Sequence, residues 1–289
     1  MANQPIVLVG VPDTGKTNFL GRLWEALRGG KGTLVCPTPP DNIKYVEDAL
    51  GHVLQGSFAP RSNKNIGESR SDVLITVAVA GMTGGPATDL IVPDVTGELW
   101  RKAVATLEMP AQWMGDLQGA SGAMLFVRIL SAEIVAPLDW IAARDVLRGT
   151  LTLSSEEERL PTQVELCELL RFLELSLKPR QDGSPPRVAV IVTAYDLLDA
   201  DRAKLGPSLY LEREYPLFAG RLQDAKTLSI RTFGASIVGG DLDVDEEFRS
   251  QFLDGEMSEF GFIVAEQNGV IETVRDITRP LAWLVHGDG

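Results

Sequence analysis

The sequence predicts a three-layer α/β fold, in which a mostly parallel sheet carries helices on both faces. Three predominantly apolar runs predict strands buried on both faces, at Ile6–Val9, Ala123–Ile129 and Val188–Val192. Between these runs, apolar residues recur three and four positions apart, which is the spacing of one helix face. Strands that alternate with helices pair in parallel, because each crossover helix returns the chain to the same end of the sheet.

The first part of the chain already shows this alternation. The strand at Ile6–Val9 leads into a Gly-rich turn and then into a helix, in which Leu20, Leu23, Trp24 and Leu27 lie on one face. The elements expected next are a helix over 41–55, a polar loop over 57–71, strands at Val73–Ala80 and Asp89–Val92, and a helix over Gly97–Glu108.

The second half continues the pattern after an irregular stretch at 130–160. Thr162 and Glu165 match a capping box, in which two side chains bind the free backbone N–H groups of a helix start, and this helix is expected to reach Leu177. The elements expected after it are a strand at Val188–Val192, helical residues 207–224 broken at Pro216, a strand at Leu228–Phe233, an acidic loop over 239–258, a hairpin over Phe262–Ile271 and a final helix over Asp276–Val285.

The spacing of the elements predicts a single domain over residues 1–289. Strands continue at intervals to residue 233, and no long linker divides the chain. The segments at about 31–58, 130–160 and 237–272 are expected to be insertions into this domain.

Composition excludes several classes of function. The formal net charge of −13 argues against nucleic acid as the main partner, because phosphate contacts need a basic face. Cys36 and Cys167 form no C-x-x-C pair, and His52 and His286 are too few for a His-rich metal site. No export signal and no apolar run of about 18 residues are present, so we expect a cytoplasmic protein without a membrane span.

Residues 10–17 have the sequence GVPDTGKT, which fits the phosphate-binding pattern G-x-x-x-x-G-K-T. Gly10 and Gly15 allow the tight turn, so that successive N–H groups form an anion cradle at the start of a helix. Lys16 is expected to reach the β- and γ-phosphates, and the Thr17 hydroxyl to bind Mg²⁺. The expected strand before the loop and helix after it favour this interpretation over a structural Gly-rich turn.

A second motif follows the strand at Asp89–Val92. Asp94-Val95-Thr96-Gly97 fits D-x-x-G, which places Asp94 as a second Mg²⁺ ligand and the Gly97 N–H beside the γ-phosphate. Loss of that phosphate would release the segment. The alternative is a strand that ends in an ordinary capped turn.

Two further motifs follow later strands. Thr193-Ala194-Tyr195-Asp196 has the order of the guanine-specificity motif N-K-x-D, in which the aspartate accepts both guanine N1–H and N2–H. Here threonine replaces the asparagine and Ala194 replaces the lysine that stacks over the base; an ordinary strand-end cap is the alternative. Gly234-Ala235-Ser236 is expected as a small-residue turn whose N–H meets guanine O6.

The order of these four motifs over residues 6–236 resembles the TRAFAC class of P-loop GTPases, which have a Ras-like core. The insertions and the C-terminal DITRPLAWLV are similar to the bacterial double-GTPase (DO-GTPase) families. Those families are associated with conflict or defence systems, in which a GTPase works with dedicated partner proteins. The resemblance implies GTP or GDP as ligand, Mg²⁺ as cofactor, and a paralogous GTPase or a second copy of the chain as partner.

The resemblance also carries over a set of site residues. The nucleotide-binding residues are Gly10, Asp13, Thr14, Gly15, Lys16, Thr17, Asn18, Thr193, Asp196, Ala235 and Ser236. The catalytic residues are Lys16, Thr17, Gly97 and Glu98, and the Mg²⁺ ligands are Thr17 and Asp94.

Three departures from the family pattern bear on catalysis. Glu98 stands where a glutamine often orients the attacking water, which predicts slow hydrolysis; alternatively it simply begins a helix. Asp13 occupies the position that helps to hold K⁺ in cation-stimulated GTPases, or it is a solvent-facing loop residue. No threonine stands between Phe58 and Ser71 to close on Mg²⁺. The candidates there are Ser62, Ser69 and Ser71 as substitutes, and Arg61 and Arg70 as γ-phosphate contacts.

Three functions remain open at this level. The first is a GTP-hydrolysing switch, whose 58–71 and 94–110 segments respond to the nucleotide. The second is an interaction module that binds GTP with little or no hydrolysis, which Glu98 and the missing threonine favour. The third is a P-loop kinase or ATPase, against which the position of Asp196 argues.

Overall fold

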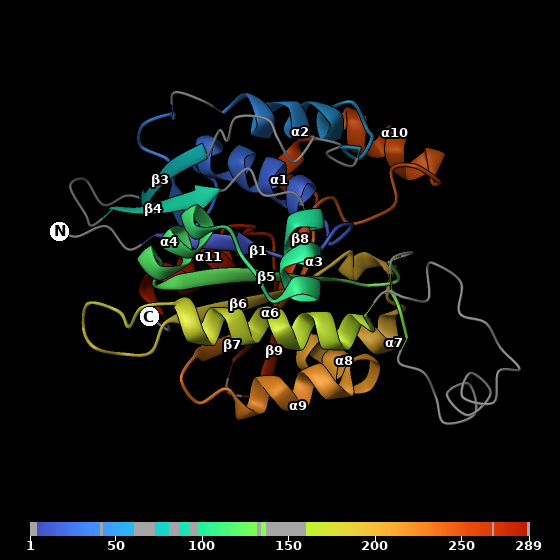
Figure 1. The fold of residues 1–289 in the computed structure, drawn as a ribbon. Helices are drawn as coiled ribbons and strands as arrows, with labels where there is room; N and C mark the ends of the chain where they lie inside the picture. Colours follow the sequence, from blue (N-terminus) through green and yellow to red (C-terminus); the bar gives the residue numbers. More distant parts are fainter. Residues whose placement is uncertain are drawn as a thin grey trace, which may run out of the picture.

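The computed structural model of the protein describes residues 5–40, 43–60, 73–80, 87–92, 97–131, 134–136, 160–267 and 269–287. Within these residues one nine-stranded sheet has the order β2-β3-β4-β1-β5-β6-β7-β8-β9 (Figure 1). The strands are β1 Ile6–Val9, β2 Leu34–Val35, β3 Val73–Val79, β4 Ala87–Val92, β5 Gly122–Arg128, β6 Arg187–Thr193, β7 Ser229–Ser236, β8 Phe262–Gln267 and β9 Val270–Val274.

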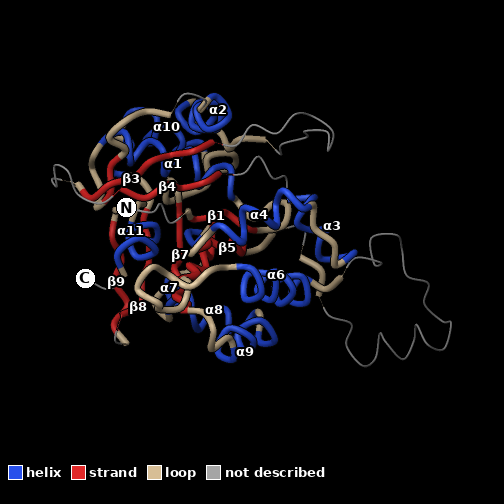
Figure 2. The backbone as a smooth tube through the Cα atoms, turned by 60° about the vertical axis from the view of Figure 1, so that its left-hand side comes forward, coloured by secondary structure: helices blue, strands red, loops and turns tan. Residues whose placement is uncertain are grey.

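Helices pack on both faces of this sheet, as Figures 1 and 2 show from two sides. They are α1 Lys16–Gly29, α2 Lys44–Leu54, α3 Gly97–Thr106, α4 Ala111–Gly119, α6 Thr162–Ser176, α7 Ala200–Ala203, α8 Gly206–Glu214, α9 Pro216–Asp224, α10 Glu246–Asp254 and α11 Arg279–His286, with 3-10 turns η1 Tyr195–Leu197 and η2 Met257–Glu259. No helix within the described ranges combines the length and the apolar character needed to cross a membrane.

The parallel part of the sheet lies at its centre. Strand β1 pairs in parallel with β4 and β5, and β5, β6 and β7 continue in parallel. The pairs β2-β3 and β3-β4 at one side, and β7-β8 and β8-β9 at the other, are antiparallel. The predicted α/β class with a mostly parallel sheet is therefore confirmed, with hairpin-like margins added to the parallel centre.

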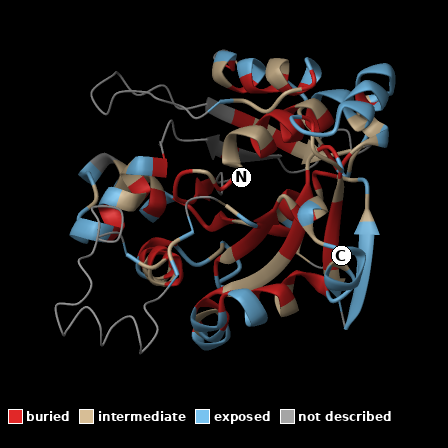
Figure 3. Cartoon of the chain, turned by 90° about the vertical axis from the view of Figure 1, so that its right-hand side faces the viewer, coloured by how far each residue is buried: buried red, intermediate tan, exposed pale blue. Residues whose placement is uncertain are grey.

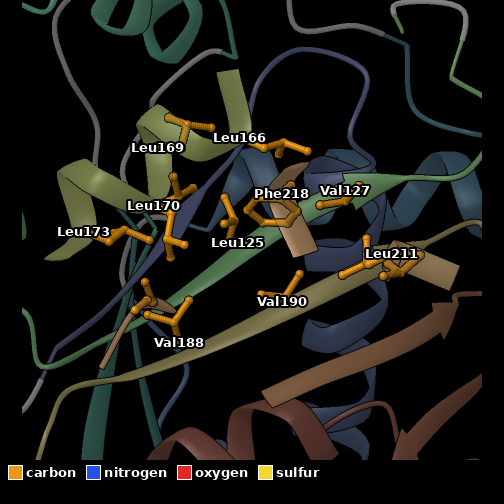
Figure 4. Close-up of a cluster of buried hydrophobic side chains, with 14 of the residues drawn as sticks. Leu125, Val127, Leu166, Leu169, Leu170, Leu173, Val188, Val190, Leu211 and Phe218 are labelled. Carbon is orange, nitrogen blue, oxygen red and sulfur yellow. The ribbon is translucent and has the colours of Figure 1, made fainter. Parts of the chain in front are cut away.

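The central strands are apolar throughout because successive side chains enter two different cores. Ile6 and Leu8 of β1 point to the core that α1, α2 and α11 cover, whereas Val7 and Val9 point to the core beneath α3, α4, α6, α8 and α9. Figure 4 shows the second core, in which Leu170 of α6 and Phe218 of α9 meet β5 and β6. Figure 3 shows the same three layers: the central strands are buried, and the outer surfaces of the helices are exposed.

The prediction of a loop over 239–258 is wrong, because α10 and η2 lie within it. Asp245 caps α10 by accepting a hydrogen bond from the Phe248 N–H. Phe248 and Phe252 pack with Phe260, and Phe252 reaches Val53 of α2 in a third apolar cluster. The apolar residues of this acidic segment are few and irregularly spaced, so its helical period was too weak to detect. Figures 1 and 2 show α10 beside α2.

The capping box at Thr162 and Glu165 is also wrong, although the helix itself is confirmed. Thr162 lies inside α6, whose N-cap is Pro161, and its hydroxyl accepts a hydrogen bond from the Val135 N–H at 2.9 Å. The buried Glu165 carboxylate instead pairs with Arg101 of α3 at 3.3 Å. A local sequence pattern was thus overridden by contacts between distant segments. Helix α4 and the two-residue strand β2 were not predicted, and the single domain over 1–289 stays a prediction.

Arg22 joins α1 to the segment that follows β7. Its side chain is only 2% exposed, and it donates to the carbonyl oxygens of Ile237 (3.2 Å), Met257 (2.9 Å) and Phe260 (3.1 Å) and pairs with Glu25. One buried guanidinium therefore satisfies three carbonyl groups of a segment more than 200 positions away.

We expect Arg22→Met to lower the free energy of unfolding by about 3 kcal/mol, because it leaves a partly buried carboxylate and three carbonyls without their donor. Urea denaturation measures this change. The matched control is Arg202→Met, which removes an exposed ion pair with Asp199 and should cost less than about 1 kcal/mol. Equal stability of Arg22→Met and Arg202→Met would contradict an anchoring role.

Candidate nucleotide-binding site

A cavity of about 370 Å³ lies at the carboxyl ends of the central parallel strands, which is where open α/β sheets bind ligands. It is lined by Pro12, Asp13, Thr14, Gly15, Lys16, Thr17, Asn18, Tyr45, Phe58, Ala59, Pro60, Gly97, Glu98, Arg128, Thr193, Ala194, Asp196, Leu197, Ile237, Val238, Gly240, Asp241, Asp243 and Val244. Residues from motifs almost 200 positions apart thus share one cavity.

The loop between β1 and α1 has the predicted geometry at Gly15, whereas Gly10 does not have a positive φ. Gly15 is the N-cap of α1 and has φ of +79°, and an added Cβ would lie 3.2 Å from Thr193 Oγ1. At Gly10 an added Cβ would lie 2.9 Å from Thr14 Oγ1. Gly10 therefore packs beneath the loop rather than lining the cavity. The first N–H groups of α1, which have no partner within the helix, begin at the cavity wall and can bind an anion.

Lys16 folds over this loop. Its ammonium donates to the carbonyl oxygens of Gly10 (2.6 Å) and Val11 (2.7 Å) and to Thr14 Oγ1 (3.1 Å). Burial lowers the pKa of Lys16 to about 7, while the charge of Glu98 acts in the opposite direction. Near neutral pH its protonation therefore responds to any charge that enters the cavity.

Thr17 and Asn18 connect the start of α1 to α2 and the residues after it. The Thr17 hydroxyl lies 2.8 Å from the Tyr45 hydroxyl, and Asn18 Oδ1 accepts a hydrogen bond from the Ala59 N–H at 2.8 Å. Sequence reasoning named neither residue: Tyr45 lies in the segment at about 31–58 that was expected to be an insertion, and Ala59 lies in the 58–71 segment, where other residues were named. No local pattern marks either residue as part of a binding site.

Asp13 makes two contacts that sequence reasoning did not predict. Its Oδ1 pairs with Arg128 Nη1 at 2.7 Å, and its Oδ2 accepts from Ser131 Oγ at 2.5 Å. Asp13 has φ of +62°, an uncommon conformation for a non-Gly residue that aspartate adopts more readily than most. The two contacts hold this conformation in place.

Thr193 and Asp196 have different roles. The buried Thr193 donates to the Thr14 carbonyl at 2.9 Å, so it ties β6 to the loop. Asp196 follows at η1 and lines the cavity. Burial raises the pKa of Asp196, and a hydrogen bond from Ser236 opposes that rise. The cavity therefore contains the Asp196 carboxylate as a hydrogen-bond acceptor, next to the apolar side chain of Leu197.

Ala235 and Ser236 do not form the expected turn, because both belong to β7. Each is 1% exposed, and neither lines the cavity. The Ser236 hydroxyl instead accepts from the Gly239 N–H at 2.8 Å and supports Asp196. The segment from Ile237 to Val244 takes the place at the cavity that the turn was expected to occupy.

Gly97, the first residue of α3, packs directly on the loop. A Cβ added to it would lie 2.2 Å from the Pro12 nitrogen, so no other residue fits without movement. Glu98 beside it is exposed and lines the cavity. Asp94, Ser62, Ser69, Ser71, Arg61 and Arg70 lie outside the described residues.

Comparison with known proteins gives one family match. A family model described as Double-GTPase 1 matches residues 7–284. A search of curated proteins found no match.

Solved structures include two similar folds. A bacterial selenocysteine-specific elongation factor, EF-Sec, has 13% identity and a TM-score of 0.37, and the match covers 88% of this chain but 29% of that one. The signal recognition particle receptor complex SRb-GTP/SRX from Chaetomium thermophilum has 15% identity and a TM-score of 0.35, with 87% of this chain and 98% of that chain covered. The chain thus spans less than a third of the length of the elongation factor.

The pKa of Lys16 predicts proton uptake when a phosphate anion binds. At pH 8 a lysine with a pKa of about 7 is mostly neutral, and a bound phosphate raises that pKa, so the protein should take up close to one proton. Calorimetry of GDP binding at pH 8, in buffers with different ionisation enthalpies, measures the uptake. Lys16→Met should remove it, and an enthalpy that is the same in all buffers for the unmodified protein would contradict the prediction.

Proposed function

Because the chain belongs to the Double-GTPase 1 family, we propose that it is a GTP-hydrolysing molecular switch that acts with partner proteins in the cytoplasm. Membership of this family supports GTP binding. The observation that carries the proposal is that Lys16 and Thr17 of the phosphate loop and the carboxylate of Asp196 line the same cavity. A nucleotide with its phosphates on the loop can therefore place its base at Asp196.

The two ends of this cavity suit the two ends of GTP. Lys16 and the N–H groups that begin α1 bind the phosphates and stabilise the charge that develops as the γ-phosphoryl group is transferred to water. Asp196 accepts hydrogen bonds from guanine N1–H and N2–H, whereas adenine lacks this pair of donors. The same carboxylate therefore selects the base.

The charge of the cavity supports Mg²⁺ as cofactor. Among the described lining residues, Lys16 and Arg128 are basic, and Asp13, Glu98, Asp196, Asp241 and Asp243 are acidic, so 2 − 5 gives −3. A nucleoside triphosphate needs added positive charge to enter such a site. Thr17 and Asp94 would hold Mg²⁺, since hydroxyl and carboxylate oxygens suit this ion. When bound, it would neutralise charge on the β- and γ-phosphates.

A K⁺ ion held by Asp13 stays a prediction, and the contacts of Asp13 do not support it. Both carboxylate oxygens already have partners, in Arg128 and Ser131. Arg128 thus already gives the Asp13 carboxylate a cationic partner.

In the proposed switch, two segments would respond to the state of the nucleotide. Ala59 binds Asn18 at the start of α1, and Gly97 packs on Pro12 at the start of α3. In the proposed switch, loss of the γ-phosphate changes the position of both segments and so the affinity for a partner. By its family we propose that this partner belongs to the same bacterial conflict or defence system, as a paralogous GTPase or a second copy of this chain.

A second candidate, a GTP-binding module with little or no hydrolysis, is favoured by Glu98. This carboxylate lines the cavity and acts electrostatically on Lys16, so it lies on the phosphate side. A negative charge there repels the γ-phosphate and cannot act as a glutamine does. The nucleotide that remains bound after purification separates the candidates: GTP indicates the module, and GDP indicates the switch.

We expect turnover of GTP with Mg²⁺ and none of ATP. Lys16→Ala should lower turnover at least about tenfold, because it removes a charge-assisted contact to phosphate.

Asp196→Asn should weaken guanine binding by about 10- to 100-fold and favour xanthine, whose C2 oxygen accepts from the new amide. Release of phosphate and calorimetry measure these effects. Hydrolysis of ATP in preference to GTP would instead indicate a P-loop ATPase or kinase.

Glu98→Gln tests the cause of slow hydrolysis. Removal of the negative charge should raise GTP turnover about tenfold, because repulsion of the γ-phosphate is relieved. Glu98→Asp keeps the charge and serves as the control, with turnover near that of the unmodified protein. If Glu98→Gln leaves phosphate release unchanged under single-turnover conditions, Glu98 only begins helix α3.

A further inference from the structure

The base-binding motif of this chain lacks its lysine. Ala194 stands at that position, so β6 and η1 provide the carboxylate of Asp196 without a cation to cover the base. We propose that Arg128, at the end of the neighbouring strand β5, supplies this missing cation and contacts the base-and-sugar half of the nucleotide. The inference rests on the proposed function, since it assigns a further residue to the same site.

The sheet register places Arg128 beside the motif. Arg128 pairs with Thr193 across the parallel strands β5 and β6, so it is level with the residue that precedes Ala194. Both Arg128 and Ala194 line the cavity. The charge of Arg128 also reaches Asp196, where it lowers the pKa of that carboxyl. Arg128 therefore lies between the loop that holds the phosphates and the carboxylate that selects the base.

Asp13 holds the guanidinium in this position. Arg128 Nη1 binds Asp13 Oδ1 at 2.7 Å, and Ser131 donates to the other oxygen of the same carboxylate. The Arg128 side chain is 36% exposed, so it is neither buried in the core nor extended into solvent. A guanidinium fixed at one nitrogen keeps a planar face, which can stack on a purine or lie along a ribose.

The charges around the cavity also support this role of Arg128. Lys16 and Arg128 are the basic residues among the described lining, and Lys16 belongs to the phosphate end. Arg128 is thus the cation available, within the described lining, to the base end. Asp13 in turn serves to position Arg128, which explains why the loop carries a carboxylate next to a phosphate site.

The role predicts which nucleotides a variant affects. Arg128→Ala should weaken the binding of GDP and of GMP by the same factor, about tenfold, because the lost contact is to the base and sugar. Lys16→Ala should weaken GDP much more than GMP, because its contact is to the β-phosphate. Arg171→Ala, on the outer side of α6, is the matched control and should change neither affinity. Calorimetry with GDP and GMP measures all four proteins.

A second-site change gives a sharper test. Ala194→Lys returns the lysine to the motif, and in the Arg128→Ala background it should restore most of the lost affinity for both nucleotides. Arg128→Lys keeps the charge without the planar face and should retain part of the affinity. Asp13→Asn should lose part of the affinity for both nucleotides. Asparagine can adopt the positive φ of this position, but its neutral amide cannot form an ion pair with Arg128. The Asp13→Asn, Arg128→Ala double variant should be no weaker than Arg128→Ala alone. Thermal melting checks that each variant is folded.

Several outcomes would overturn the inference. Unchanged GDP and GMP affinity in Arg128→Ala would do so, as would a loss confined to GDP, which would place the guanidinium at the phosphates. GTP turnover that requires K⁺ rather than Na⁺, and that is lost in Asp13→Asn but kept in Arg128→Ala, would assign Asp13 to an ion instead. If the unmodified protein binds neither GDP nor GMP, the proposed function itself fails; if it binds them in a Lys16-dependent way, only the role of Arg128 is at stake.

Discussion

The arrangement of the site depends on the contacts that fix the loop between β1 and α1. Lys16 folds back onto the loop carbonyls, and Thr193 donates to Thr14 from β6. Gly97 packs on Pro12 from α3. Each contact comes from a different element, so the loop is the point through which the central strands and α3 are fixed relative to one another.

Electrostatics sets the chemical character of the site. An acidic chain presents a cavity whose described lining is itself acidic, so anion binding depends on a few well-placed groups: the N–H groups that begin α1 and the ammonium of Lys16. Burial lowers the pKa of Lys16 to about 7, so near neutral pH the charge of its side chain is sensitive to a bound phosphate. The same arrangement explains why a divalent cation is expected at Thr17.

The segment after β7 lines the cavity and also packs against α2. Val238 and Leu242 pack with Val53 and Phe252 in the third apolar cluster, and Arg22 of α1 binds the same segment through its carbonyls. The start of α1, the residues after α2 and the wall of the cavity are thus joined in one packed unit. This unit therefore connects the cavity with the residues around Ala59.

By itself the sequence determined most of the strands, most of the helices and the phosphate loop, because these depend on local spacing: runs of apolar residues, a 3.6-residue period and glycines at fixed offsets. Local patterns failed where distant groups compete, as when Glu165 pairs with Arg101 rather than capping its own helix. Only the tertiary structure decided that Arg128 meets Asp13 across 115 positions and that Tyr45 meets Thr17 across 28. The first pair forms because a parallel sheet brings the ends of its strands to one edge, and the second because helices α1 and α2 pack against each other. No sequence spacing records which side chains meet in either place.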